Sequence, residues 1–129
     1  MAEATTHEQK AKLAWKLTQE LLRDDAPGFL TINQAMYAVG HLLEYHLAKL
    51  NMHPSAAARG VPHSERGRLS RVFLVPAKVL TEEEMTRYDR LFAQRDTFCD
   101  GGFPDPQFVK AYVAEAKTLV QKLGGAWAS

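Results

Sequence analysis

The chain has little cysteine, no long apolar run and no excess of either charge, and each of these absences excludes a class of protein. A single cysteine, Cys99, cannot form an internal disulfide. No apolar run approaches the roughly 18 residues of a membrane span, so we expect no transmembrane helix. The formal net charge of +1 argues neither for nor against a nucleic-acid partner. Any electrostatic partner must therefore be inferred from local clusters of charge.

Signals for targeting and for a second domain are also missing. The N-terminus begins Met-Ala-Glu-Ala-Thr-Thr-His-Glu and lacks the basic and then apolar order of a signal peptide, so we expect a cytoplasmic location. No internal repeat or low-complexity tract is visible. A length of 129 residues is enough for one hydrophobic core, and we predict a single domain over residues 1–129.

Apolar residues recur at spacings of three and four, whereas an alternation of period two is nowhere sustained. Proline and glycine gather at a few positions that divide the chain into helical segments. The sequence therefore predicts an all-α fold, an up-and-down bundle of four to five helices. The expected helices run from about Thr6 to Arg23, from Thr31 to Leu50, from Ser64 to about Pro76, from Glu82 to Cys99 and from Pro106 to Gly124.

Capping residues mark several of these helix starts. Thr31 with Gln34, and Thr81 with Glu84, have the spacing of a capping box, in which each residue bonds the backbone N–H of the other. Asp105 stands directly before a proline and is the expected cap of the last helix.

The expected helices carry more apolar residues than one small bundle readily hides. Leu13 and Leu17 belong to the predicted apolar stripe of the first helix. Trp15, Phe29 and Trp127 lie at or near helix ends. Because large exposed apolar patches usually mark an interface, we predict a homodimer.

Arg95 is the most informative single residue, because it falls on the apolar stripe that Tyr88, Leu91 and Phe92 form. A lone buried cation is costly, whereas a cation paired with a carboxylate can be tolerated. We therefore expect Arg95 either in an internal network or in a cleft between helices.

A basic cluster falls within thirteen positions near the middle of the chain, opposed locally only by Glu65. Its spacing suits contact with a phosphate backbone and not the reading of base edges. No aromatic residue lies between the arginines for base stacking, so RNA binding is expected to be weak, non-specific and salt-dependent. The alternative is a solvated loop and helix start. The cluster consists of Arg59, His63, Arg66, Arg68 and Arg71.

Tyr37, His41 and Glu44 form a polar file on the second helix, at spacings of four and three. A di-iron bundle needs two Glu-x-x-His motifs, and none occurs here. We therefore interpret His41 and Glu44 as a hydrogen-bonded surface pair and expect no metal and no other cofactor. His46 lies on the apolar stripe and is interpreted as a hydrogen-bonded core histidine.

Three segments together resemble the HEPN superfamily, and most of all its small single-domain branch. They are the helix Asn-Gln-Ala-Met-Tyr-Ala-Val-Gly-His-Leu-Leu at residues 33–43, the loop that ends in His63 before a basic stretch, and Leu-Phe-Ala-Gln-Arg-Asp-Thr-Phe-Cys-Asp-Gly at residues 91–101. The resemblance covers about Thr31 to Leu123. It implies an up-and-down helical bundle, commonly a dimer.

The superfamily includes metal-independent ribonucleases of toxin–antitoxin and antiviral systems, often paired with nucleotidyltransferases. Its ribonucleases use an arginine followed four to six residues later by a histidine on the same helix. Arg95 matches the arginine, but Asp100, Gly101 and Gly102 stand where the histidine is expected. An arginine alone could stabilise phosphate charge and could not shuttle a proton. The resemblance therefore implies a degenerate ribonuclease motif.

The preferred hypothesis is a non-catalytic HEPN-like binding or assembly subunit that contacts RNA or a partner protein, such as a nucleotidyltransferase, in a toxin–antitoxin or antiviral defence system. One alternative is a metal-independent ribonuclease that uses Arg95 and His63. Another is a purely structural oligomerisation module. The surroundings of Arg95 discriminate among them: a cleft facing a histidine favours an enzyme, neighbouring cations favour a binding subunit, and burial against an acid favours a scaffold.

Overall fold

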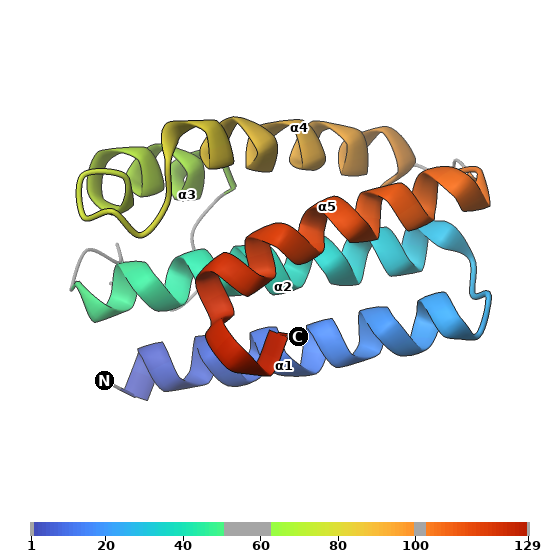
Figure 1. Ribbon diagram of the computed structural model, residues 1–129, viewed down its shortest axis with the longest axis horizontal. Helices are drawn as coiled ribbons and strands as arrows, with labels where there is room; N and C mark the ends of the chain where they lie inside the picture. The colour runs from blue at the N-terminus through green and yellow to red at the C-terminus, as the bar shows by residue number, and fades with distance from the viewer. Residues whose placement is uncertain (1, 51–62, 100–102, 129) are drawn as a thin grey trace.

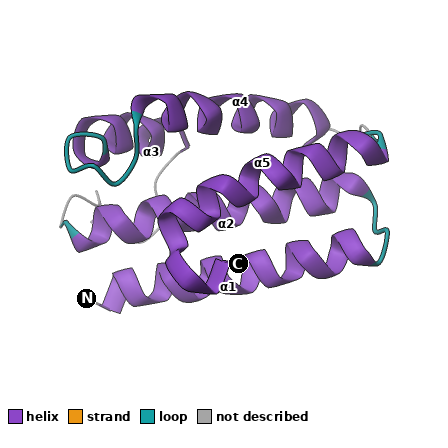
Figure 2. Ribbon diagram, viewed as in Figure 1, coloured by secondary structure: helices purple, strands orange, loops and turns teal. Residues whose placement is uncertain are grey.

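The computed structural model describes residues 2–50, 63–99 and 103–128. Every element in these ranges is helical, and they contain no strand (Figure 2). The predicted all-α fold with five α-helices is therefore confirmed. The elements are α1 (Ala2–Arg23), α2 (Gly28–Lys49), α3 (His63–Leu69), the π-helix η1 (Ser70–Leu74), α4 (Glu82–Cys99), α5 (Pro106–Gly124) and the 3₁₀-helix η2 (Gly125–Ala128).

Helix α2 is the centre of the bundle and packs against α1, α3, α4 and α5. α1 runs along one side of it, whereas α3 and α4 lie on the opposite side (Figure 1). α5 returns alongside α2 and closes the core, which takes aliphatic residues from all of these helices. Because its partners surround it, α2 supplies the largest set of fully buried side chains, among them Ile32, Val39, Leu42, Leu43 and Leu47. None of the described helices combines the length and apolar character needed to cross a bilayer.

The starts of α4 and α5 confirm the capping predictions. Thr81 N–H donates to Glu84 Oε1 over 2.8 Å, and Glu84 N–H donates to Thr81 Oγ1 over 3.1 Å, which completes a capping box. At α5, Gln107 N–H donates to Asp105 Oδ1 over 2.7 Å. Both helices therefore begin at the predicted residue.

The predicted start of α2 at Thr31 is wrong. The helix begins at Gly28, after Pro27, which has a φ of −51° and makes no side-chain cap. Thr31 is buried inside the first turns of the helix and cannot cap it. Gly28 suits this start because a Cβ there would lie 2.5 Å from Val109 of α5. The proline geometry and the close packing of α5 thus set the boundary in place of the capping box.

The predicted inward face of α1 is also wrong. Leu13 is 69% exposed and Leu17 is exposed as well, whereas the neighbouring face of Ala11, Ala14 and Trp15 is buried. Small alanine side chains let α1 approach α2 closely, and Trp15 buries more apolar area than a leucine. Trp15 therefore gives no support to the predicted dimer, and the apolar side chains that α1 exposes are instead Leu13 and Leu17.

The third helix is followed directly by one wide turn. Val75 N–H donates to the Ser70 carbonyl, five residues earlier, over 3.2 Å, as in a π-helix. Leu74 is buried, whereas Val72 is exposed and does not contribute to the core. The helical segment ends at Leu74, before Pro76, as the sequence predicts.

Candidate functional site

Arg95 reaches into a pocket of about 280 Å³ between α2 and α4. Its Nε donates to Asn33 Oδ1 over 3.1 Å, and its Nη1 donates to Asp96 Oδ1 over 3.3 Å. The guanidinium also stands 5.5 Å from the centre of the Phe92 ring. Its side chain remains 24% exposed, so Arg95 belongs neither to the core nor to open solvent. The described residues lining the pocket are Asn33, Met36, Tyr37, His41, Arg66, Phe92 and Arg95.

Arg66 forms the inner wall of this pocket, and its place corrects the sequence prediction. As part of the basic cluster it was expected either to contact phosphates or to lie on a solvated helix start, yet it is buried. Arg66 Nη2 donates to Glu44 Oε2 over 3.2 Å, and Nη1 lies 3.5 Å from the Tyr88 hydroxyl. Gly40 permits this position, because a Cβ there would lie 2.6 Å from Arg66 Nη1. Burial raises the pKa of Tyr88, with Arg66 opposing the rise, so the phenol stays neutral beside the ion pair.

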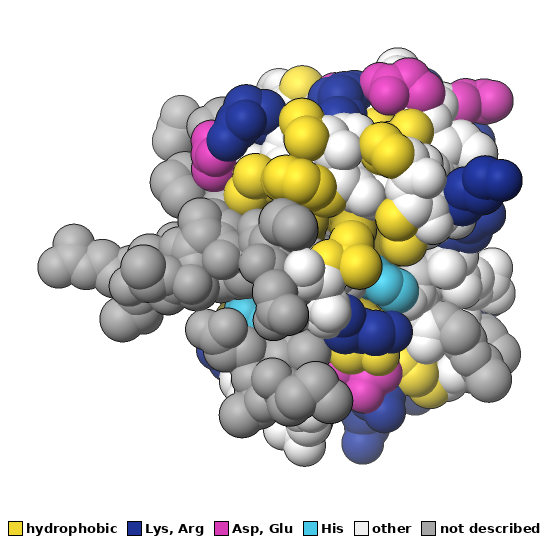
Figure 3. Space-filling model, turned by 90° about the vertical axis from the view of Figure 1, so that its left-hand side faces the viewer, with side chains coloured by type: hydrophobic (Ala, Val, Ile, Leu, Met, Phe, Trp, Pro, Cys, Tyr) yellow, Lys and Arg dark blue, Asp and Glu magenta, His cyan; other side chains and the backbone are white. Residues whose placement is uncertain are grey.

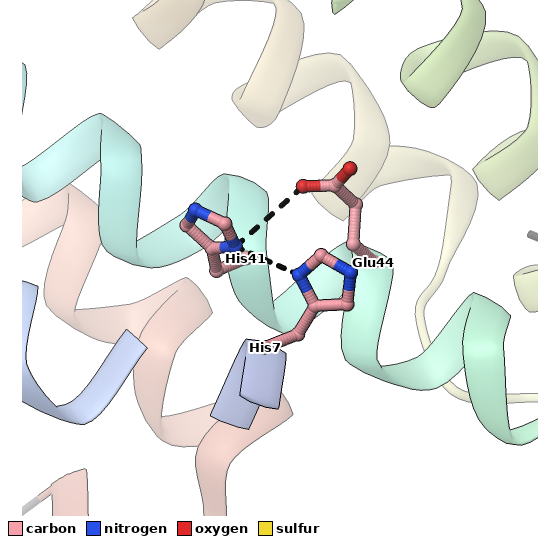
Figure 4. Close-up of side chains that lie close together, drawn as sticks. All are labelled: His7, His41 and Glu44. Atoms are coloured by element: carbon pink, nitrogen blue, oxygen red, sulfur yellow. Dashed lines mark hydrogen bonds and ion pairs between the residues drawn. The ribbon is translucent and has the colours of Figure 1, made fainter. Parts of the chain in front are cut away.

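Glu44 is also buried, with 2% of its side chain exposed, so the predicted surface pair with His41 is wrong. Its Oε2 lies 3.7 Å from His41 Nδ1, a separation that is too long for a hydrogen bond. The side chain within hydrogen-bonding distance of His41 is that of His7 in α1, which the sequence did not indicate. Its Nδ1 lies 2.9 Å from His41 Nδ1 (Figure 4). These three side chains form a cluster that joins α1 to α2, and we call it the His–His–Glu cluster.

Burial lowers the pKa of His41 to about 4, against the opposing effect of Glu44. His7 and the nearby cations Arg66 and Lys10 contribute to this lowering. His41 is therefore neutral at physiological pH and presents one N–H and one lone pair. A neutral imidazole accepts a hydrogen bond or a metal ion, but it carries no ready proton to donate as an acid.

The two other arginines of the basic cluster that the structure describes, Arg68 and Arg71, are paired with carboxylates. Arg68 bonds Glu65, whereas Arg71 Nε donates to Glu82 over 2.7 Å and its Nη2 donates to Asp89 over 2.5 Å. The cations were therefore less available for phosphates than the local sequence indicated. Arg59 lies outside the described residues. His63 begins α3, but its side chain is also outside the described part, so its predicted approach to Arg95 stays a prediction.

His46 is separate from the site, as predicted. It is half-buried, and its Nε2 lies 2.8 Å from the Leu123 carbonyl of α5. Burial lowers its pKa, with the carbonyl acting in the opposite direction. The neutral ring therefore donates to α5, a structural role.

The end of the bundle that carries the N-terminus of α1 and the C-terminal part of α2 shows histidine side chains at its surface, beside cationic and hydrophobic ones (Figure 3).

Comparison of the chain with protein-family models, curated proteins and solved structures finds no match. Function must therefore be argued from the Arg95 pocket and from the His–His–Glu cluster themselves.

Proposed function

We propose that this protein is a non-catalytic HEPN-like binding subunit that holds an RNA phosphate at the Arg95 pocket. The observation that supports this is the orientation of Arg95: Asn33, Asp96 and Phe92 hold the guanidinium at the mouth of a concave site while leaving part of it exposed. A fixed guanidinium loses little entropy on binding an anion, and its planar fork matches a phosphate. Arg66 lies in the inner wall, where Glu44 pairs with its charge, so Arg95 is the cation that meets the phosphate.

The same pocket argues against proton transfer at neutral pH. Cleavage of RNA needs a group that gives a proton to the leaving oxygen, and such a group works best with a pKa near the operating pH. His41 is the histidine that lines the described pocket, and its pKa of about 4 keeps it unprotonated there. The described residues thus supply charge stabilisation without a ready proton donor.

A metal-independent ribonuclease remains the second candidate, because the pocket brings an arginine and a histidine together. In that case Arg95 stabilises the phosphate and a histidine moves the proton. The sequence predicts His63 for this proton transfer, and His41, which lines the pocket, is a second candidate for it.

We also propose that the subunit assembles as a homodimer through α1 and α2. Leu13, Leu17 and Tyr37 are exposed and line one shallow hollow across these two helices. A contiguous apolar surface of this kind is covered most simply by a second copy, in which the same face meets itself about a twofold axis. A protein partner such as a nucleotidyltransferase would compete for the same surface.

The decisive experiment measures fluorescence anisotropy of a labelled single-stranded RNA with the wild type, Arg95→Ala and Arg90→Ala. Arg90 is the matched control, because it lies on the same helix and pairs with Glu115 away from the pocket. We expect Arg95→Ala to weaken binding about tenfold, as for the loss of one charged hydrogen-bonding group, and Arg90→Ala to bind normally. Equal binding by all three proteins would contradict the proposal.

A parallel incubation of unlabelled RNA without metal separates binding from catalysis. We expect no cleavage above background. Cleavage that disappears separately in Arg95→Ala and in a histidine variant, His41→Gln or His63→Ala, would replace the binding proposal by the ribonuclease.

A further inference from the structure

His7, His41 and Glu44 present two imidazole nitrogens and a carboxylate oxygen that all lie within 4.8 Å of one another. His7 projects from α1, whereas His41 and Glu44 project from one face of α2, three residues apart (Figure 4). The packing of α1 on α2 therefore brings the three groups together, and no covalent or loop constraint is required.

Two of the three separations among these atoms are close to those around a tetrahedral ion. Two bonds of about 2.0–2.1 Å at a tetrahedral angle place their ligand atoms roughly 3.3 Å apart. The two measured separations lie on either side of that value: His7 Nδ1 to His41 Nδ1 is 2.9 Å, and His41 Nδ1 to Glu44 Oε2 is 3.7 Å. The third pair, His7 and Glu44, lies within 4.8 Å, so side-chain rotations that bring these two atoms closer by up to about 1.5 Å would place all three groups on one ion.

The surroundings of the cluster prepare these groups for a metal. Arg66 contacts Glu44 Oε2 over 3.2 Å and holds the carboxylate from the side of α3. A ligating carboxylate is usually oriented by such an outer hydrogen bond, and a carboxylate oxygen has lone pairs for both partners.

Without a metal, the two imidazoles must face each other ring nitrogen to ring nitrogen. One Nδ1 then has to carry a hydrogen and the other must not, so two of the four combinations of neutral tautomers are allowed. A cation bound by both nitrogens would replace this hydrogen bond, with each ring then in its Nε2–H tautomer.

We propose that His7, His41 and Glu44 bind one divalent transition-metal ion, with Zn²⁺ as the preferred occupant. Two histidines and one glutamate are a ligand set that zinc uses when one coordination position is left for water or for another ligand. The site does not depend on RNA binding, since none of its ligands is Arg95. His41 also lines the Arg95 pocket, so an occupied site would add positive charge to its wall.

The test is isothermal titration calorimetry of ZnCl₂ into the untagged full-length protein after treatment with EDTA. We expect one ion per chain with a dissociation constant below about 1 μM, corresponding to roughly 8 kcal/mol of binding free energy. Replacing Zn²⁺ by Co²⁺ gives an independent readout, because tetrahedral Co²⁺ has strong visible absorption. A wild-type protein that binds no Zn²⁺ at concentrations up to 100 times this value would refute the site.

His7→Ala is the most informative variant, because His7 is only half-buried near the start of α1, where alanine favours the helix. We expect His7→Ala and Glu44→Gln to weaken Zn²⁺ binding more than tenfold and to lose the Co²⁺ absorption. His46→Gln is the matched control, since it removes a partly buried histidine outside the cluster, and should bind as the wild type does. Binding that survives in His7→Ala, with circular dichroism showing a folded protein, would overturn the proposal whatever the behaviour of Glu44→Gln.

Discussion

The buried pair of Arg66 and Glu44 gives the sharpest prediction about stability. Their side chains are 10% and 2% exposed, and the nearest charged atoms lie 3.2 Å apart. At an effective dielectric constant of about 20, two unit charges at this distance attract by roughly 5 kcal/mol. Much of this attraction offsets the cost of taking both groups out of water, so the pair adds little net stability. Removing only one partner is different, because the other charge stays buried.

We therefore expect Arg66→Met to destabilise the protein by about 3 kcal/mol, the lower end of the range for a broken buried pair, since Glu44 keeps its other contacts. For 129 residues with an unfolding entropy of about 2.1 cal/mol/K each, this corresponds to a fall in Tm of roughly 11 °C. The double variant Arg66→Met/Glu44→Leu removes both charges and should recover at least half of the loss. Both values are measurable by urea and thermal unfolding followed by circular dichroism.

If the double variant is as unstable as the sum of the two single variants, the two side chains do not interact, and the stability comes from packing alone. The unfolding measurements should be made in buffer that contains EDTA, so that bound metal does not stabilise the wild type more than the variants.

Three further predictions follow from other parts of the molecule. Burial lowers the pKa of His41 from 6.5 to about 4 and also lowers the pKa of His46, so the folded state binds fewer protons than the unfolded state. The free energy of unfolding should therefore be highest above about pH 6.5 and should fall as the pH drops towards 4. Urea unfolding in EDTA at several pH values will measure this slope, which His41→Gln should reduce. Thr81→Ala should cost about 1 kcal/mol by removing the capping box of α4, whereas Thr81→Ser should keep it; equal stability of the two variants in urea would contradict the capping role. Leu13→Lys with Leu17→Lys should convert a dimer into a monomer in sedimentation equilibrium without loss of helix content, and a wild type that is already monomeric at tens of micromolar would exclude the dimer.

The elements that could be predicted from the sequence are those set by short-range interactions. Thr81 and Glu84 bond each other across three residues, and Asp105 bonds a backbone N–H two residues ahead. Such contacts need no knowledge of the rest of the fold, and α4 and α5 accordingly start where expected. The start of α2 was missed because Pro27 and the contact between Gly28 and Val109 of α5 set it, and the second of these is a tertiary contact.

The buried face of α1 shows a second limit. Leu13 and Leu17 form one apolar stripe, and Ala14 and Trp15 belong to its neighbour, so the periodicity of 3.6 residues permits either rotation of the helix. In the folded protein the face with the small alanines and the large tryptophan is buried, because these side chains together pack closely against α2. Composition alone does not rank these two faces.

The site depends on contacts that span much longer separations. His7 lies 34 residues before His41, and Glu44 lies 22 residues before Arg66. Each pairing therefore depends on how two helices are rotated about their axes and on how far one is shifted along the other. One local signal was nevertheless present. A glycine inside a helix costs about 0.5–1 kcal/mol relative to alanine and often marks a close approach of another group. Gly40 is such a residue, and the group that approaches it is the Arg66 guanidinium. Because His41 follows Gly40 directly and Glu44 is one turn further on, this glycine marks the level of α2 at which the Arg95 pocket and the His–His–Glu cluster meet.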